Sequence, residues 1–321
     1  MSAIAAVANK TPPPRCFLCH STETRSQDRL TPRELELLWF HLGVKFGADA
    51  TSVFDGISAL ELHQCGGCGF RFFHPSLPGN GAFYADLQRQ YRDYYPQTCP
   101  AFARTLAVAR REKITEVMDL GCGAGYFLDA ARNEGLTTHG LDLNPDAAAD
   151  CRARGHDVQC STAEAYAAGR PDRRFPLVTA FEVMEHVPDP RAFFQEVAAL
   201  VAPGGYLALA VPNDAGIHGW CSLEPHQWPP HHLTRWRAQD LRRLGELHGL
   251  EIVSIEGDLL RGSALRFYLK LQRELEFVLG RRKSRPGGLW PQLLTFIYRI
   301  LFLRRWMQKG ISLHALYRKP L

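Results

Sequence analysis

The sequence predicts an α/β protein in which a doubly wound sheet follows a small cysteine-rich module. Three observations lead to this prediction. Short apolar runs alternate with amphipathic helical segments from residue 115 onward, a glycine-rich turn follows the first run, and two Cys-x-x-Cys pairs precede them. With 321 residues, 45% of them hydrophobic, the chain has the length of about two domains.

Residues 1–14 are predicted to be a disordered leader. They are mildly apolar but have no basic start, and prolines stand where a signal peptidase site would lie. The longest apolar run near the C-terminus, residues 293–303, is about half a bilayer span and contains Arg299. We therefore expect a cytoplasmic protein without a transmembrane helix, whose cysteines bind metal or stay as incidental thiols rather than form disulfides.

Residues 15–80 are predicted to form a zinc-binding module. Cys16 and Cys19 make the first Cys-x-x-Cys pair, and Cys65 and Cys68 make the second. Each pair can present two thiolates to one ion, and two pairs complete a tetrahedron. Because four thiolates leave no open position, the zinc would be structural. Cysteines that pack without an ion are the alternative.

The segments after the module predict a helical connector and then the main sheet. Residues 81–114, rich in tyrosine and arginine, are expected to be helical and to lead into the main domain. Apolar runs that suit parallel strands are found at residues 117–120, 138–143, 158–160, 177–181 and 206–211. The amphipathic segments between them, at residues 126–134, 146–154 and 190–200, are expected to be helices that cover the sheet.

The glycine-rich turn Gly-Cys-Gly-Ala-Gly, residues 121–125, follows the first strand. Its glycines allow a sharp turn and a close approach of a ligand, while the next helix presents free N–H groups. A dinucleotide fingerprint needs glycine where Tyr126 stands, which argues against NAD. Asp142, at the end of the second strand, is placed to accept hydrogen bonds from the hydroxyl groups of an adenosine ribose.

Four segments resemble, in order and spacing, the class I S-adenosylmethionine (SAM)-dependent methyltransferases. They are Val117-Met-Asp-Leu-Gly-Cys-Gly-Ala-Gly125, Gly140-Leu-Asp-Leu143, Phe181-Glu-Val-Met-Glu-His-Val-Pro-Asp-Pro190 and Leu200-Val-Ala-Pro-Gly-Gly-Tyr206. The resemblance covers residues 115–260, the predicted SAM-binding core. It implies a Rossmann-like sheet of seven strands, whose antiparallel last strand lies between the fifth and the sixth. Residues 250–256 suit the sixth strand and residues 311–321 the last.

The same resemblance implies which residues hold SAM. The amino acid end of the cofactor would lie on the glycine turn and its ribose on Asp142. The full set is Asp119, Gly121, Cys122, Gly123, Gly125, Tyr126, Asp142, Leu143, Thr162, Ala163, Phe181 and Glu182. In this set Leu143 would pack on adenine, and Phe181 or Glu182 would close over the sulfonium. In similar enzymes the tyrosine-rich stretch covers the cofactor, and a packed aromatic seam is the alternative for Tyr91, Tyr94 or Tyr95.

Methyl transfer to a hydroxyl group needs a base as well as in-line positioning. The candidates are Glu182, Glu185 and His186, whose spacing suits one side of a helical turn, together with His231 and His232 after the fifth strand. The Glu-x-x-Glu-His pattern is also similar to small-RNA and quinone-pathway O-methyltransferases that bind a divalent cation there. Mg or Mn at Glu182, Glu185 and His186 is therefore a second hypothesis, and a structural role is a third.

The order of cysteine pairs, tyrosine-rich stretch and core is similar to that of sugar methyltransferases in polysaccharide biosynthesis. We therefore expect a sugar, sugar nucleotide or lipid-linked glycan acceptor, methylated at oxygen or carbon. From residue 261 to the end, 14 basic residues accompany two acidic ones, a net charge of +12, so the rest carries −7. The basic insertion, residues 261–310, is expected to contain two helices. They would meet acceptor phosphates or, through residues 281–309, the inner face of the membrane; a solvated face is the alternative.

An RNA methyltransferase is the second function considered, because the basic region would bind phosphates. Against it, the fourth strand lacks the Asn/Asp-Pro-Pro-Tyr signature of amino-directed base methylation, and no Pro-Cys dipeptide follows it. A scaffold that binds the cofactor without turnover is a third class. The sequence does not determine the oligomeric state.

Overall fold

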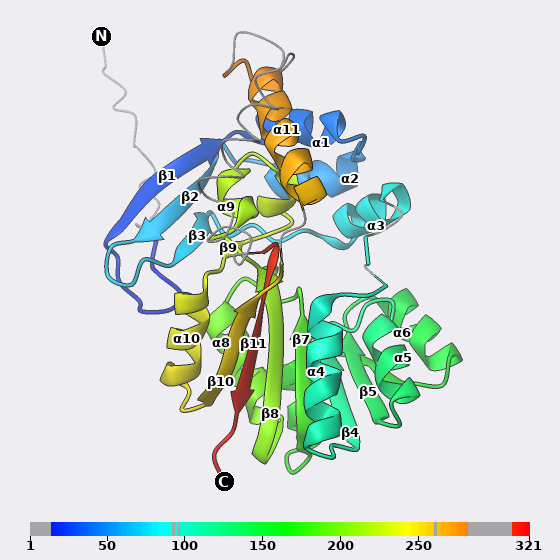
Figure 1. The fold of residues 1–321 in the computed structure, drawn as a ribbon. Coiled ribbons are helices and arrows are strands. Elements are labelled where there is room, and N and C mark those ends of the chain that lie inside the picture. The colour runs from blue at the N-terminus through cyan, green and yellow to red at the C-terminus, as the bar shows by residue number, and fades with distance from the viewer. Residues whose placement is uncertain (1–13, 92–93, 96, 260–261, 282–309) are drawn as a thin grey trace, which may run out of the picture.

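The computed structural model describes residues 14–91, 94–95, 97–259, 262–281 and 310–321. They form a seven-stranded sheet with helices on both faces and a smaller sheet that stands at one end of it (Figure 1). This arrangement confirms the predicted α/β fold with a cysteine cluster near the N-terminus.

The large sheet has the strand order β10-β11-β8-β7-β4-β5-β6. Its strands are β4 (Glu116–Leu120), β5 (Thr137–Asp142), β6 (Asp157–Cys160), β7 (Phe175–Phe181), β8 (Val201–Pro212), β10 (Glu251–Gly257) and β11 (Ser312–Arg318). β11 is antiparallel to both neighbours, and its Ala315 lies opposite Leu209 of β8 and Ile255 of β10. The last strand of the chain therefore lies inside the sheet, as predicted.

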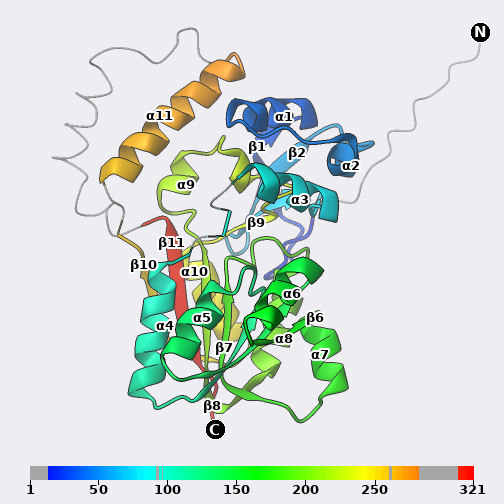
Figure 2. The ribbon, with the colours of Figure 1, turned by 90° about the vertical axis from the view of Figure 1, so that its right-hand side faces the viewer.

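Six helices of the core cover the two faces of this sheet (Figure 2). They are α4 (Pro100–Arg111), α5 (Tyr126–Asn133), α6 (Pro145–Ala153), α7 (Ala163–Gly169), α8 (Pro190–Ala199) and α10 (Ala238–Leu247). Along β8, Tyr206 and Ala208 join an apolar cluster with α4 and α5, whereas Leu207 and Leu209 join one with α8 and α10. Because side chains alternate along a strand, one strand supplies apolar contacts to both layers.

Two helices of the core begin at signals that the sequence carries. Asn144 caps α6 and Asp189 caps α8; each side chain accepts hydrogen bonds from the first turn of its helix, and a proline takes the first helical position. Such a cap contributes about 1 kcal/mol to stability. Asp189 also fixes where the loop after β7 ends, and this loop carries several of the predicted site residues.

The smaller sheet has the strand order β1-β2-β3-β9. β1 (Thr24–Leu30), β2 (Leu60–Cys65) and β3 (Arg71–His74) are consecutive, but β9 (Thr234–Arg235) comes from the core half of the chain and pairs antiparallel with β3. Around this sheet lie α1 (Pro32–His41), α2 (Ala48–Thr51), η1 (Ser52–Phe54), α3 (Gly81–Gln90), α9 (Ile217–Trp220), η2 (Pro225–Gln227) and α11 (Gly262–Val278). The sequence did not predict that the chain returns from the core to this sheet.

The basic insertion is described only in part. α11 corresponds to the first of its two expected helices and contacts α1 of the module. The second expected helix and the proposed membrane contact at residues 282–309 lie outside the described residues. Among the helices that are described, none has the length and apolar character needed to cross a membrane.

Candidate cofactor and acceptor site

The glycine turn lies where β4 ends, at the edge of the large sheet that faces the module (Figure 1). Gly121, Gly123 and Gly125 have φ angles of 69°, 50° and 72°, in the left-handed region that favours glycine. The turn is also tightly packed, because a Cβ at Gly121 would lie 2.5 Å from Val183 and one at Gly125 2.6 Å from the Cys151 Sγ. α5 starts at Tyr126, directly after the turn, so its first N–H groups are presented at this edge.

Two carboxyl groups accompany the turn. Asp142 Oδ2 accepts a hydrogen bond from Gly123 N at 2.7 Å, and its Oδ1 accepts one from Asn144 N at 2.8 Å. Asp119 is buried at the end of β4, where its Oδ1 accepts a hydrogen bond from Thr179 Oγ1 at 2.6 Å. Burial raises the pKa of Asp119 to about 7. The Asp142 side chain thus connects the end of β5 with the glycine turn that follows β4.

Four other predicted cofactor residues lie beyond the turn or within it. Leu143 is 70% exposed, whereas Cys122 is buried in an apolar cluster with α6. Thr162 caps α7 by accepting a hydrogen bond from Ala165 N at 3.1 Å, and Ala163 is the buried first residue of that helix. The hydroxyl of Thr162 is therefore used by the fold, while the side chain of Leu143 is free to cover a ligand.

The two residues predicted to close over the sulfonium point elsewhere. The Phe181 ring packs against the rings of Phe102 and Phe127 at centroid distances of 5.3 and 4.9 Å, which places it in the layer of α4 and α5. Glu182 has a φ of 55°, and its Oε1 accepts a hydrogen bond from Ser312 Oγ of β11 at 2.9 Å. Burial raises the pKa of Glu182. The positive φ is a strained conformation at the point where the chain leaves β7.

Two tyrosines connect the glycine turn with a group of histidines. The Tyr95 ring lies over Gly123, since a Cβ at that glycine would lie 2.6 Å from it. The rings of Tyr94 and Tyr95 are 4.9 Å apart, and Tyr94 Oη lies 3.2 Å from His231 Nε2. Burial raises the pKa of both tyrosines, so their hydroxyl groups stay protonated.

Glu185, His186, His231 and His232 form what we call the histidine centre. One ring nitrogen from each of the three histidines lies within 4.8 Å of the others. His186 Nδ1 lies 2.6 Å from the His231 carbonyl, and His231 Nδ1 lies 2.9 Å from the carbonyl of His226. Each Nδ1 therefore carries the proton and donates it, which leaves both Nε2 atoms as acceptors or ligands.

Burial disfavours charge in the histidine centre. Glu185 Oε1 lies 3.6 Å from His186 Nε2 and 3.9 Å from His232 Nε2, and neither carboxyl oxygen has a hydrogen-bond partner among the described residues. Burial raises the pKa of Glu185 well above its usual range and lowers that of His186 to about 4. Burial also lowers the pKa of His231 and His232. Burial therefore disfavours the charged form of each of these groups.

Glu182, Glu185 and His186 do not lie together on one side of a helical turn, contrary to the prediction from the sequence. Residues 182–189 form a series of turns rather than a helix, and Glu182 is directed to β11. Glu185 and His186 meet His231 and His232, which precede β9. Sequence reasoning did not assign Tyr94 to this group, although its position in the tyrosine-rich stretch was a signal for it.

The four cysteines of the module come together as well. Their Sγ atoms lie within 4.8 Å of one another, with 3.5 Å between Cys16 and Cys68 and 3.4 Å between Cys19 and Cys65. Zinc–thiolate bonds of about 2.3 Å place the sulfurs of a tetrahedral site about 3.8 Å apart. The cluster is therefore compatible with a structural zinc ion.

Comparison of the sequence with known protein families agrees with the fold and the glycine turn. The sequence model of a protein family described as a methyltransferase domain matches residues 87–255. This is more than half of the chain, and the protein belongs to that family.

Curated relatives carry a more particular name. The ubiquinone biosynthesis O-methyltransferase of Thiobacillus denitrificans is 36% identical over 104 residues, which are 30% of this chain and 44% of that protein. The protein of the same name from Idiomarina loihiensis is 30% identical over 160 residues, 44% of this chain and 64% of that protein. The chain thus spans about half the length of these curated relatives. None of these names mentions a sugar or a polysaccharide.

A solved structure shows the same fold. The crystal structure of a SAM-dependent methyltransferase from Archaeoglobus fulgidus aligns with 74% of this chain and 100% of its own, with a TM-score of 0.50 and 20% sequence identity. At this identity the likeness concerns the fold alone.

Proposed function

We propose that this enzyme transfers the methyl group of SAM to a hydroxyl oxygen and that the histidine centre activates this hydroxyl. One observation carries the proposal: imidazoles with unprotonated Nε2 atoms are buried next to Tyr94, whose ring packs on Tyr95, and Tyr95 lies over the glycine turn. The names of the two curated relatives, both O-methyltransferases, support oxygen as the methylated atom.

The residue that meets the acceptor is His186 in this proposal. Its side chain is 19% exposed, against 7% for His232, and its Nδ1 is engaged by the His231 carbonyl, so Nε2 is the nitrogen left for a hydroxyl group. Nε2 would take the hydroxyl proton, and bound SAM would supply the methyl group to the oxygen, with S-adenosylhomocysteine as the leaving group. The His231 carbonyl holds the required tautomer, and Glu185 Oε1, 3.6 Å from Nε2, is the oxygen that could accept a hydrogen bond from the ring once it carries the proton.

The same centre fits a divalent cation, which is our second candidate for the activation. The two oxygens of Glu185 and the Nδ1 of His232 are buried without hydrogen-bond partners among the described residues, and neutral imidazoles are good ligands. His186, His231, His232 and Glu185 would hold the ion, whereas the sequence suggested Glu182, Glu185 and His186. Three imidazoles favour Mn over Mg. A bound cation would lower the pKa of the acceptor hydroxyl.

The proposal also covers the class of acceptor and a structural zinc ion. The order of the sequence elements supports a sugar, sugar nucleotide or lipid-linked glycan acceptor. The relatives' names support an acceptor of ubiquinone biosynthesis instead. The cysteine geometry supports one structural zinc ion in the module.

Cofactor binding is tested first. S-adenosylhomocysteine is titrated calorimetrically into the zinc-checked chain, with NADH as the comparator and Asp142→Ala as the variant. We expect binding of S-adenosylhomocysteine alone, with an affinity at least about tenfold lower in the variant, because the carboxylate that would hold the ribose is lost. No binding by the folded chain would contradict the cofactor assignment.

Turnover is tested with methyl-labelled SAM and three acceptor sources: sugar nucleotides, lipid extracts and RNA. His186→Gln is expected to keep its affinity for S-adenosylhomocysteine within about twofold and to lose at least about 100-fold in kcat. Loss of activity with a chelator and recovery with Mn would assign the activation to a cation. Label that appears only in nuclease-sensitive material would overturn the proposal in favour of RNA methylation.

A further inference from the structure

Two loops carry the histidine centre, and both are attached to the cysteine module. The first loop, residues 182–189, brings Glu185 and His186; the second loop, residues 225–233, brings His231 and His232. We propose that the module positions the centre and that Arg191 and Arg237 are the positioning residues, each of which links one cysteine pair to one loop. This inference rests on the proposed function of the centre.

Arg191 links the first cysteine pair to the first loop. It is the second residue of α8, which begins where this loop ends, and its Nη1 donates a hydrogen bond to the carbonyl of Leu18 at 3.2 Å. Leu18 stands between Cys16 and Cys19. It is fully buried in the same apolar cluster as Met184, a member of the loop. Leu18 therefore supports the first loop in two ways. Its carbonyl accepts the hydrogen bond from Arg191, and its side chain shares an apolar cluster with Met184.

Arg237 links the second cysteine pair to the segment that follows the second loop through β9. Its Nη2 donates a hydrogen bond to the carbonyl of Gly69, which directly follows Cys68. Its Nε lies 3.1 Å from Asp240 Oδ2, so the guanidinium is held from two sides. The preceding Trp236 packs on Phe70, with ring centroids 4.8 Å apart. The chain just after β9 is thus fixed to the Cys65–Cys68 turn.

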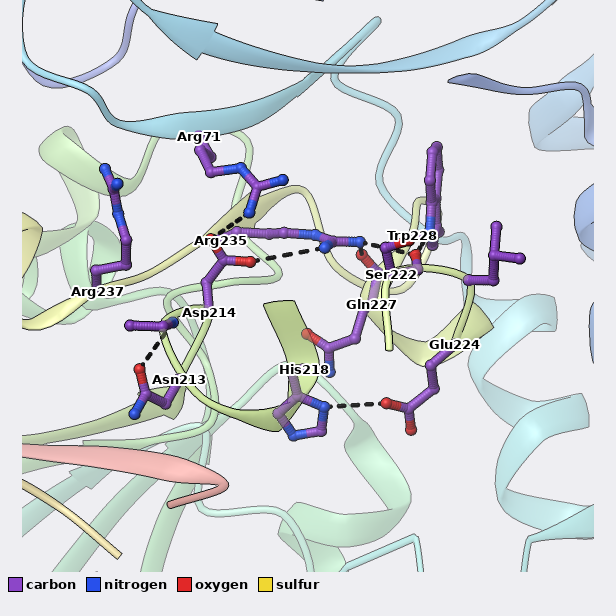
Figure 3. Close-up of polar contacts among 12 residues, drawn as sticks. Arg71, Asn213, Asp214, His218, Ser222, Glu224, Gln227, Trp228, Arg235 and Arg237 are labelled. Carbon is purple, nitrogen blue, oxygen red and sulfur yellow. Dashed lines mark hydrogen bonds and ion pairs between the residues drawn. The ribbon is translucent and has the colours of Figure 1, made fainter. Parts of the chain in front are cut away.

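The second loop has a further attachment, which Figure 3 shows. Asp214 lies between two arginines, 2.6 Å from Arg71 Nη1 of β3 and 3.6 Å from Arg235 Nη1 of β9. Arg235 is buried, and its Nη2 donates to the carbonyls of Ser222 and Gln227, both at 3.3 Å. Breaking such a buried pair by removing one partner is costly, so this attachment is a poor target for a variant that must fold.

The two loops also hold each other. Leu233 N donates to the Glu185 carbonyl at 2.7 Å, and His186 Nδ1 donates to the His231 carbonyl at 2.6 Å. Because each loop has its own link to the module, loss of one link displaces one half of the centre relative to the other. The glycine turn contacts the first loop through Val183, but its hydrogen bond to the Asp142 side chain lies within the core. Loss of a link should therefore impair the centre and leave cofactor binding intact.

The experiment compares Arg191→Ala and Arg237→Ala with their Lys variants and with Arg243→Ala, a change of an exposed arginine on α10. The probe is diethyl pyrocarbonate, whose rate of reaction with each histidine is followed by mass spectrometry of peptides. We expect the alanine variants to raise the rate at His186 or His231 by about tenfold, as expected for the loss of one charge-assisted hydrogen bond. The Lys variants should restore part of the protection, since Lys can also donate to a carbonyl.

The affinity for S-adenosylhomocysteine distinguishes positioning from a general loss of structure. It should change by less than about twofold in all five variants. Unchanged histidine reactivity in the folded alanine variants, or equal losses of protection and cofactor affinity, would overturn the inference. If an alanine variant does not fold, its Lys variant decides, because partial loss of protection is still expected there. If His186→Gln keeps full turnover while Arg237→Ala still alters reactivity, the proposed function fails and the positioning holds.

Discussion

At Asp119, burial and a hydrogen bond act in opposite directions on one carboxyl group. Burial raises its pKa to about 7, while the hydrogen bond from Thr179 lowers it. The folded chain therefore binds a proton at this site more tightly than the unfolded chain, whose carboxyl has a pKa of about 3.9. Between pH 4 and 7 the unfolded state binds fewer protons, so this group makes the free energy of unfolding fall as the pH rises.

The variant Asp119→Asn is expected to remove this dependence. The free energy of unfolding of the native chain should fall relative to that of the variant by up to about 1.4 kcal/mol per pH unit between pH 4 and 7. Urea denaturation at pH 5, 6 and 7 measures it, with Asp172→Asn, a change of an exposed aspartate, as the control. Parallel pH profiles for the native chain and Asp119→Asn would show that this carboxyl is ionised in the folded state.

Gly123 combines a backbone requirement with a requirement for space. In Gly123→Ala the left-handed backbone costs about 1–2 kcal/mol, and the new methyl group meets the Tyr95 ring. We expect the affinity for S-adenosylhomocysteine to fall at least about tenfold. Gly135→Ala is the matched control, because Gly135 has a φ of 87° with open space around its Cβ position. It should lose similar stability but keep the affinity, and equal affinity losses would contradict the prediction.

At the scale of elements, β11 connects β10 to the rest of the large sheet. It pairs with β8 on one side and β10 on the other, and its Ala315 and Tyr317 are fully buried. Without β11, two strands would expose unpaired backbone groups and an apolar face. The sheet therefore needs the end of the chain for its stability.

A chain truncated after residue 310 is expected to lose its cooperative thermal unfolding transition, as followed by circular dichroism. Removal of residues 320–321 alone should shift the melting temperature by no more than about 2 °C, since Lys319 still donates to the carbonyls of Ala198 and Val201. If the chain truncated after residue 310 folds and binds S-adenosylhomocysteine, β8 and β10 do not depend on β11 for their stability.

At the scale of the whole molecule, the module and the core share one apolar cluster. Phe70 and Phe72 of the module belong to the same buried group as Phe194 of α8 and Leu241 of α10. β9 adds backbone hydrogen bonds between the two parts. A metal ion that holds the cysteines would therefore stabilise more than the module alone.

We expect the purified chain to contain about one zinc ion and Cys65→Ser to lose it, with a lower melting temperature as the result. Metal analysis and thermal unfolding measure the two effects. Cys160→Ser is the control, because Cys160 is exposed and outside the cluster. A native chain that is folded and free of metal would show that these cysteines pack without an ion.

The sequence by itself determined the fold class, the glycine turn and the cysteine pairs. These features depend on short windows, in which side-chain periodicity, glycine and the cysteine spacing carry the information. The antiparallel last strand between the fifth and the sixth followed instead from the resemblance to class I methyltransferases. Asp142 was also predictable as a residue beside the glycine turn, because it lies at a fixed distance after it.

Only the tertiary structure decided how the candidate site is assembled. Glu182 turns to Ser312, Phe181 packs with α4 and α5, and Thr162 caps a helix, although the family resemblance implies a cofactor contact for each of them. The pairing of β9 with β3 and the meeting of His186 with His231 also lay beyond the sequence. The physical reason is that these contacts join residues far apart in the chain, whose positions depend on packing between the module and the core.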